Sequence, residues 1–192
     1  MVLVVAITGA SGAIYGIRLL EVLKKAKDVE THLVISESAA RTIEYETKYK
    51  VSDVLKLAHR YYDNKDIGAN IASGSFRRDG MIVIPCSIKT MGALAHSYSE
   101  NLVIRAGDVT LKERKRLVLV VRETPLHLGH LRNMVQLTEM GAVIMPPVTN
   151  FYSKPKNIDD LINHLVGRAL DLFNIDNSLV KRWQGEEPEG SA

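Results

Sequence analysis

The sequence begins with a buried strand that turns through glycines into a helix. The apolar run Val2–Ile7 is followed by Thr8-Gly9-Ala10-Ser11-Gly12 and then by a helical pattern over 13–27. Glycines in such a turn let the backbone approach an anion, which the helix dipole and the first N–H groups attract. A dinucleotide site requires G-x-G-x-x-G and an acidic residue about 20 residues later. The glycines here stand at 9, 12 and 16 and the second strand ends at Ser36, so the turn predicts a mononucleotide site rather than an NAD site.

Strand-like runs rich in β-branched residues alternate with helical patterns along the chain. Strands are predicted at 2–7, 31–35, 81–85, 117–121 and 142–145, and helices at 13–27, 37–48, 52–58, 89–96, 101–115, 128–140 and 158–174. Strands that are apolar on both faces and separated by helices indicate an α/β fold, with a mostly parallel sheet covered by helices on both faces. Ligands of such sheets bind at the carboxyl ends of the strands, so the loops that follow the strands are the candidate site.

Size and charge favour one ordinary globular domain. The chain has 192 residues and a net charge of +3, which is too small to indicate a nucleic-acid partner. Its basic clusters, at 77–78 and 112–116, have no interleaved aromatic residues, and Lys112 taken alone is expected on a solvated helix face. No apolar run reaches the roughly 18 residues of a membrane span, and the first strand is not a signal peptide. The single cysteine, Cys86, excludes an internal disulfide and fits a cytoplasmic protein.

Hydroxyl groups follow three of the predicted strands. Ser11 and Ser36 each stand just before a helix, where a serine can cap the helix, contact a ligand, or do both. The segment 85–90 ends the third strand, and its hydroxyl and N–H groups favour contact with a phosphate or a ring edge. Cys86 lies in this segment without a histidine nearby in sequence, so we interpret it as a core residue rather than a nucleophile.

Charged residues after the fourth strand and on the last helix each have two interpretations. Arg122 and Glu123 form either a surface pair or an anion clamp beside a carboxylate that handles protons. Arg168 lies at the edge of the apolar stripe of helix 158–174, where it either extends outward or reaches a phosphate together with Tyr152.

A metal site is not expected. His127 and His130 stand three positions apart, but no cysteine, aspartate or further histidine nearby completes a site. The only paired aspartates, Asp159 and Asp160, stand at a helix start. Any phosphate chemistry would therefore depend on Arg, Lys, hydroxyl and N–H groups.

In their order and spacing, these segments resemble the flavin prenyltransferase family (UbiX-type), which is related to the flavoprotein cysteine decarboxylases. The resemblance runs from about Val2 to Trp183. It rests on Thr8-Gly9-Ala10-Ser11-Gly12 with Tyr15-Gly16, Ala72-Ser73-Gly74-Ser75, Pro85-Cys86-Ser87 with Thr90, Asn101-Leu102, Arg105-Ala106, Leu111-Lys112-Glu113-Arg114, Leu117-Val118-Leu119-Val120, Arg122-Glu123-Thr124-Pro125, His130-Leu131, Asn133-Met134, Gly141-Ala142, Phe151-Tyr152 and Arg182-Trp183.

The resemblance implies a single Rossmann-like or flavodoxin-like domain over residues 1–183, followed by a flexible tail over 184–192. Members of the family bind FMN and join a dimethylallyl group to N5 and C6 of its reduced form, which is a co-substrate. The donor is typically dimethylallyl monophosphate and no metal is needed. The product, prenylated FMN, serves a UbiD-type decarboxylase, and members usually assemble as homo-dodecamers.

The resemblance also implies roles for individual residues. FMN would contact Gly9, Ala10, Ser11, Ser36, Ser87, Ile88, Lys89, Thr90, Arg105 and Arg122. The prenyl phosphate would contact Ser73, Lys112, Arg122, Tyr152 and Arg168, with Trp183 as a wall for the prenyl group. The catalytic residues would be Ser11, Glu123, Lys112 and Glu46. Of these, Ser11 and Glu123 would assist proton movements at the flavin, with Glu46 and Arg105 nearby.

Two other functions remain to be compared. An FMN-dependent decarboxylase of the peptidyl-cysteine or phosphopantothenoylcysteine type shares the fold, but it typically has Pro-Ala-Ser-Ala-Asn-Thr where this chain has Pro85-Cys86-Ser87-Ile88-Lys89-Thr90. It also has a histidine in the region that corresponds to 37–48. An FMN-binding electron carrier is usually acidic, whereas the pI here is about 8.9.

Overall fold

The structure is a computed structural model that describes residues 1–180 and 182. The chain divides into two compact units, Met1–Pro147 and Val148–Ala192, and each is described by itself. The predicted tail and Trp183 lie outside the described residues. None of the described helices combines the length and the apolar composition that crossing a membrane requires.

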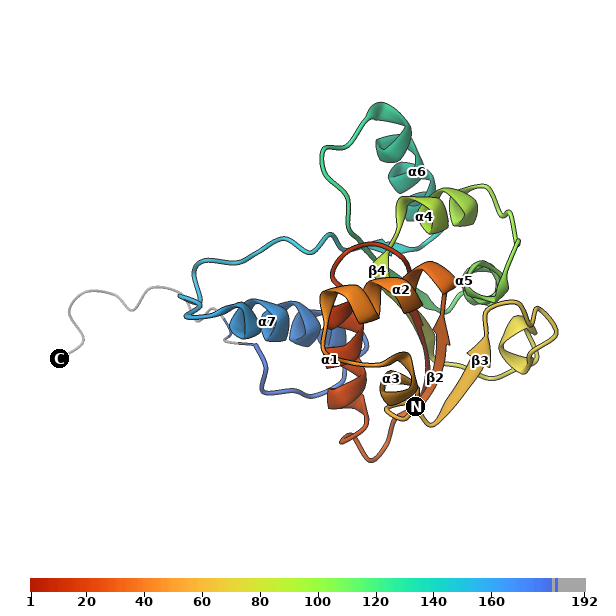
Figure 1. Ribbon diagram of the computed structural model, residues 1–192. Helices are drawn as coiled ribbons and strands as arrows, with labels where there is room; N and C mark the ends of the chain where they lie inside the picture. The colour runs from red at the N-terminus through yellow and green to blue at the C-terminus, as the bar shows by residue number, and fades with distance from the viewer. Residues whose placement is uncertain (181, 183–192) are drawn as a thin grey trace. The chain divides into compact units, whose positions relative to one another are not determined.

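The first unit is built on a six-stranded sheet whose neighbouring strands are all parallel (Figure 1). The strands are β1 (Val2–Ile7), β2 (Glu30–Ile35), β3 (Arg60–Asp63), β4 (Gly80–Cys86), β5 (Arg116–Val121) and β6 (Val143–Ile144). Their order is β3-β2-β1-β4-β5-β6, which is the Rossmann order. The prediction of an α/β fold with a parallel sheet is therefore confirmed. The order reverses between β1 and β4, where such folds bind ligands.

Both faces of the sheet are covered, because side chains that alternate along a strand pack against different helices. Val4 and Ala6 of β1 belong to an apolar cluster with residues of α4 (Ile88–Ala95) and α5 (Leu102–Lys112). Ile7 projects to the other face, where Gly16 of α1 (Ala13–Leu23) approaches its side chain closely. Helices on both faces, as predicted, are confirmed.

The other elements connect the strands. In the first unit they are α2 (Glu37–Glu46), α3 (Val51–Leu55), a 3₁₀ turn (Asn70–Ala72) and α6 (Leu128–Glu139). The second unit contains α7 (Ile158–Asp171).

The two largest differences from the prediction concern β3 and α1, whereas α2, α3, α5 and α7 end two or three residues earlier than predicted. The edge strand β3 was not predicted, because its four residues are polar or aromatic and mostly exposed, with no apolar run. Helix α1 ends at Leu23 rather than Lys27, because the amides of Lys25 and Ala26 bond three residues back in a tightening turn.

Candidate functional site

A cavity of about 520 Å³ opens at the carboxyl ends of β1, β2, β3 and β4, where the strand order reverses. It brings together five of the residues predicted to hold FMN, namely Gly9, Ser36, Ser87, Lys89 and Thr90. It is also lined by Glu37, Ser38, Asn64, Lys65, Glu100, Asn101 and Ile104. Of the other predicted FMN residues, Ala10 and Ser11 lie in the turn after β1, and Ile88 begins α4.

The N-termini of α2, α4 and α5 converge on this cavity. Their N-cap residues, Ser36, Ser87 and Asn101, all line it, and each side chain accepts an N–H of its own helix at 3.1, 3.3 and 3.2 Å. The positive ends of three helix dipoles therefore point at one space, and this arrangement attracts an anion.

Two lysines add positive charge to the cavity. Lys65 pairs with Glu37 at 2.6 Å and Lys89 pairs with Glu100 at 3.5 Å. The four side chains are exposed, and ion pairs of this kind contribute little stability, so a phosphate can replace the carboxylates. The hydroxyls, helix amides and lysines together fit a ligand of FMN type, with its phosphate at the helix N-termini.

Close approach of β1 and β4 shapes the cavity wall. The buried hydroxyl of Thr8 donates to the carbonyl of Pro85 and accepts from the amide of Ser87, both at 2.8 Å. Gly9 lies so near Ser38 that a Cβ atom would overlap the serine side chain. A glycine at this position therefore permits the loops after β1 and β2 to meet.

The N-terminus of α1 corrects the prediction that Ser11 stands at the N-cap. The N-cap is Gly12, whose φ of 98° lies in the left-handed region that favours glycine, and the exposed Ser11 makes no capping bond. Glu46 takes this place instead: its Oε2 accepts the amides of Gly12 at 2.8 Å and of Ala13 at 3.3 Å. The amides in which the sequence indicated a phosphate site are thus bonded to a carboxylate of α2.

Arg122 and Glu123 follow β5, with exposed side chains. The amide of Arg122 donates to the carbonyl of Cys86 at 3.1 Å, which places it beside the loop that carries Ser87. Burial raises the pKa of Tyr15, and the positive charge of Arg122 partly offsets this effect. Within the described residues no ion pair joins Arg122 to Glu123, whose carboxylate accepts the amide of Thr124 at 2.9 Å. The surface-pair interpretation is therefore not what the structure shows, and the functional interpretation of the two side chains stays a prediction.

The structure confirms that Cys86 is a core residue. Its side chain is fully buried, and this burial raises the pKa of its thiol. A buried thiol with a raised pKa is a poor nucleophile.

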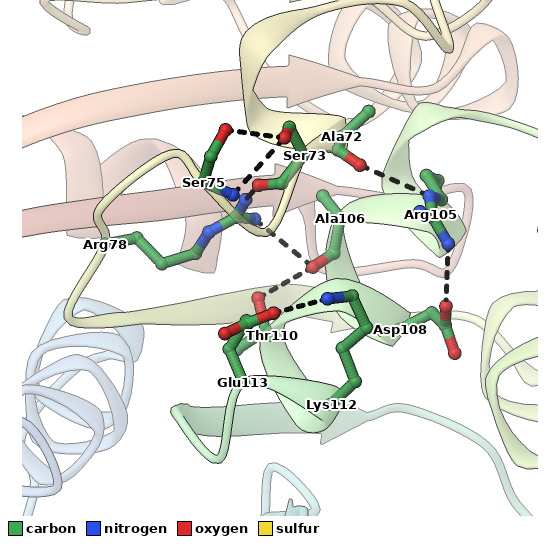
Figure 2. Close-up of polar contacts among 10 residues, drawn as sticks. All are labelled: Ala72, Ser73, Ser75, Arg78, Arg105, Ala106, Asp108, Thr110, Lys112 and Glu113. Atoms are coloured by element: carbon green, nitrogen blue, oxygen red, sulfur yellow. Dashed lines mark hydrogen bonds and ion pairs between the residues drawn. The ribbon is translucent and has the colours of Figure 1, made fainter.

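A second group of predicted residues meets at the end of α5 (Figure 2). A Cβ atom on Gly74 would lie 2.6 Å from Nζ of Lys112, so the turn that carries Ser73 contacts the lysine. Lys112 pairs with Glu113 and lowers the pKa of that carboxyl group. Arg105, which was predicted to contact FMN, does not line the cavity. It contacts the same turn instead, since its Nε donates to the carbonyl of Ala72 at 3.2 Å.

In the second unit, Tyr152 and Arg168 line a hollow of about 400 Å³ together with Val180 and Arg182. Asp171 accepts from Arg168 at 2.9 Å and from both terminal nitrogens of Arg182, at 3.1 and 2.9 Å. These bonds, led by those from Arg182, hold the pKa of Asp171 below its usual range. The two arginines that line the hollow therefore share one carboxylate, that of Asp171, and this excess of positive charge suits an anionic ligand.

Sequence reasoning missed several of these residues. Asn64 and Lys65 follow strand β3, which was not predicted. The turn-forming residues after Tyr61-Tyr62 could have indicated a loop at the end of a strand. Asp171 stands one helical turn after Arg168, a spacing at which opposite charges pair. Within the described residues no three His, Cys, Asp or Glu side chains come together as metal ligands.

Comparison with known proteins agrees with this geometry. The profile of the Flavoprotein family matches residues 1–170. Flavin prenyltransferase UbiX of Thauera aromatica is 59% identical over 187 residues, covering 97% of this chain and 96% of that protein. The corresponding protein of Escherichia coli K12 is 56% identical over 185 residues, covering 95% and 98%.

Solved structures agree as well. AnUbiX (PadA1), crystallised with FMN and dimethylallyl pyrophosphate, superposes with a TM-score of 0.95 at 53% identity, covering 97% of this chain and 98% of that one. The peptidyl-cysteine decarboxylase EpiD is only 21% identical, covering 78% and 82%, and its TM-score of 0.59 shows a shared fold alone. The chain therefore belongs to the Flavoprotein family and, within it, to the UbiX flavin prenyltransferases.

Proposed function

We propose that this protein is a flavin prenyltransferase, which joins the dimethylallyl group of dimethylallyl phosphate to N5 and C6 of reduced FMN. The observation that carries the proposal is the cavity at the ends of β1 to β4, where three helix N-termini and two lysines suit the phosphate of a flavin mononucleotide. Its relatives carry the name of this activity, and one was crystallised with both FMN and dimethylallyl pyrophosphate.

FMN is held in this proposal by the hydroxyls of Ser36, Ser87 and Thr90, the backbone of the turn after β1, and Lys89. Arg122 reaches the flavin from the end of β5. Once bound, reduced FMN supplies the electron-rich N5 and C6 atoms that receive the alkyl group. The two hydrogen bonds of the Thr8 hydroxyl hold the loops after β1 and β4 together at the cavity wall.

The donor phosphate is assigned to Ser73, Lys112 and Arg122 of the first unit and to Tyr152 and Arg168 of the second. Lys112 ends α5 before β5 and Arg122 follows β5, so one chain does not bring these two cations to the same phosphate, and we assign the site to residues of neighbouring subunits. Breaking the allylic C–O bond leaves both electrons on the phosphate, and charge-assisted hydrogen bonds stabilise the negative charge that develops there. Lys112 pairs with Glu113 at an exposed position, and such a pair can be exchanged for a phosphate. Arg168 pairs with Asp171, whose side chain is 15% exposed, but Arg168 itself is half exposed and can reach an anion from its open side. Trp183 is assigned to the wall around the prenyl group.

Proton transfer is assigned to Ser11, Glu46 and Glu123. The bond to C6 would use the double bond of the prenyl group, so one alkene carbon takes up a proton while C6 loses one, and a carboxyl group can give the first proton and accept the second. Glu46 is held in place by two backbone amides at the start of α1, next to Ser11. Glu123 lies at the end of β5, beside Arg122.

We further propose a homo-dodecamer in the cytoplasm that supplies prenylated FMN to a UbiD-type decarboxylase. A UbiX-like protein of Escherichia coli O157:H7, 49% identical and with a TM-score of 0.95, is described as a dodecamer. Helix α6 exposes Leu128, Leu131 and Val135 at 60%, 45% and 58%. An apolar helix face of this kind supports contact with another subunit.

Incubation of the purified protein with reduced FMN and dimethylallyl phosphate, without oxygen, tests the proposal. The flavin recovered should be heavier by one prenyl group in the mass spectrum, and parallel reactions with the pyrophosphate compare the two donors. A flavin of unchanged mass with both donors would contradict the function. Release of CO2 from a peptide that ends in cysteine would instead support the decarboxylase alternative.

A further inference from the structure

Arg78, just before β4, is a buried cation that the proposed reaction does not use. Its residue is 4% exposed, and burial lowers the pKa of its guanidinium. Among the described residues no carboxylate lies within ion-pair distance of it, and its Nε has no hydrogen-bond partner. A buried charge without a paired carboxylate is costly, so its other contacts must account for its position.

Those contacts join two segments that lie apart in the sequence (Figure 2). Nη2 of Arg78 donates to the carbonyl of Ser73 at 2.8 Å, and Nη1 donates to the carbonyl of Ala106 in α5 at 3.4 Å. The guanidinium also lies over the ring of Phe76, 5.4 Å from its centre. The guanidinium of Arg78 therefore links the turn 73–75 to α5 through hydrogen bonds from two of its nitrogens.

A second arginine holds the preceding carbonyl of the same turn. Nε of Arg105 donates to the carbonyl of Ala72 at 3.2 Å, so two successive carbonyls are occupied by cations. The hydroxyls of Ser73 and Ser75 bond to each other at 2.8 Å, and the amide of Ser75 donates to Oγ of Ser73 at 3.3 Å. Because Arg78 and Arg105 bond to the carbonyl groups of the turn, its serine hydroxyls can donate hydrogen bonds to an anion.

The turn also fixes the place of Lys112. Gly74 leaves no room for a Cβ atom, because one would overlap Glu113 and lie 2.6 Å from Nζ of Lys112. The negative charge of Glu113 is the one that favours the charged form of Arg78. Arg78, the turn and the Lys112–Glu113 pair thus form one connected group.

We propose that Arg78 is a positioning residue for the donor phosphate, because it holds the turn 73–75 where Ser73 and Lys112 can bind that phosphate together. This inference rests on the proposed function. A purely structural arginine would affect the stability of the fold, and with it every ligand, in equal measure. A positioning residue affects the prenyl donor selectively, since Arg78 does not line the cavity assigned to FMN.

The test replaces Arg78 by glutamine and uses Arg77→Gln as the matched control. Arg77 is the exposed neighbour, so both variants lose one positive charge at almost the same place. At saturating reduced FMN, we expect KM for dimethylallyl phosphate to rise about tenfold in Arg78→Gln, with kcat changed less than about twofold. FMN binding, measured by flavin fluorescence, should stay within about twofold in both variants, and Arg77→Gln should match the wild type.

Two more variants distinguish the two hydrogen bonds of the Arg78 guanidinium from its positive charge. Arg78→Lys keeps the charge but cannot hold two carbonyls in the same way, so its KM should stay raised. Gly74→Ala displaces the side chain of Lys112 without changing Arg78, so it should also raise KM for dimethylallyl phosphate. This variant tests the positioning role even if Arg78→Gln does not fold.

Each contrary result has a distinct meaning. An unchanged KM in Arg78→Gln or Gly74→Ala, full rescue by lysine, or a parallel loss of FMN binding would overturn the positioning role. If the wild-type protein formed no prenylated flavin in the same assay, the proposed function itself would fail.

Discussion

Glu46 joins the end of α2 to the start of α1, and its removal should destabilise the protein measurably. In the variant Glu46→Ala the amides of Gly12 and Ala13 lose the carboxylate that accepts them at 2.8 and 3.3 Å. Loss of a side-chain cap costs about 0.5–2 kcal/mol, and loss of a negative charge at a helix N-terminus costs about 0.3–1 kcal/mol. Because Glu46 is exposed, water can replace part of both interactions, and we expect a loss of about 1–2 kcal/mol.

Thermal unfolding at one fixed protein concentration measures this loss. For a chain of this length 1 kcal/mol corresponds to roughly 2–4 °C, so Tm should fall by about 2–8 °C. Glu46→Gln keeps an acceptor oxygen and should lose only about 1–2 °C. Glu44→Ala removes an exposed glutamate from the same helix and serves as the control.

Activity separates the two roles assigned to Glu46. If this carboxylate accepts a proton, Glu46→Gln should be slower by about a hundredfold or more although it is nearly as stable as the wild type. A Tm for Glu46→Ala equal to that of Glu44→Ala would refute the capping role. Full activity in Glu46→Gln would refute the proton transfer.

Three further outcomes are expected. Gly16→Ala should lower the free energy of unfolding by about 1–3 kcal/mol in urea titrations, because its Cβ would lie 2.5 Å from the backbone carbonyl of Ile84. Burial lowers the pKa of His32 below its ordinary value of 6.5, so the unfolded chain binds the proton first as the pH falls. Unfolding free energy should therefore decrease below about pH 6.5, and less steeply in His32→Gln. Lys89→Gln should weaken FMN binding about three- to tenfold, with a smaller dependence on salt, as fluorescence titrations would show.

The fold could be predicted from the sequence wherever burial leaves a clear pattern. Strands β1 and β5 are apolar on both faces because helices cover both, and their boundaries agree with the prediction to within one residue. The edge strand β3 has Tyr61 exposed on one side and has no such run, so only its pairing with β2 defines it. Short edge strands of this kind depend on tertiary contacts rather than on local sequence.

The candidate site could be predicted only in part, for the same reason. Ser36 and Ser87 follow strands that the sequence identified, and the parallel sheet brings them to one cavity. Lys65 follows β3 and was missed with it. In the sequence, Arg78 is one of two adjacent arginines in a basic cluster, and nothing local distinguishes it from Arg77. Its burial depends on the turn 73–75 folding over it, which sequence spacing does not reveal.

The turn after β1 shows why a motif identifies a type of site more readily than its occupant. The same glycines and helix amides that bind a phosphate in nucleotide-binding turns here bind Glu46, because α2 ends within reach of them. The positive ends of helices remain available for a phosphate at α2, α4 and α5, one loop away. Glu46, the residue proposed as a proton acceptor, therefore bonds to the start of α1 and does not line the cavity. The carboxylate of Glu46 and the helix N-termini that line the cavity are thus separate, so a mutation at one leaves the hydrogen bonds of the other in place.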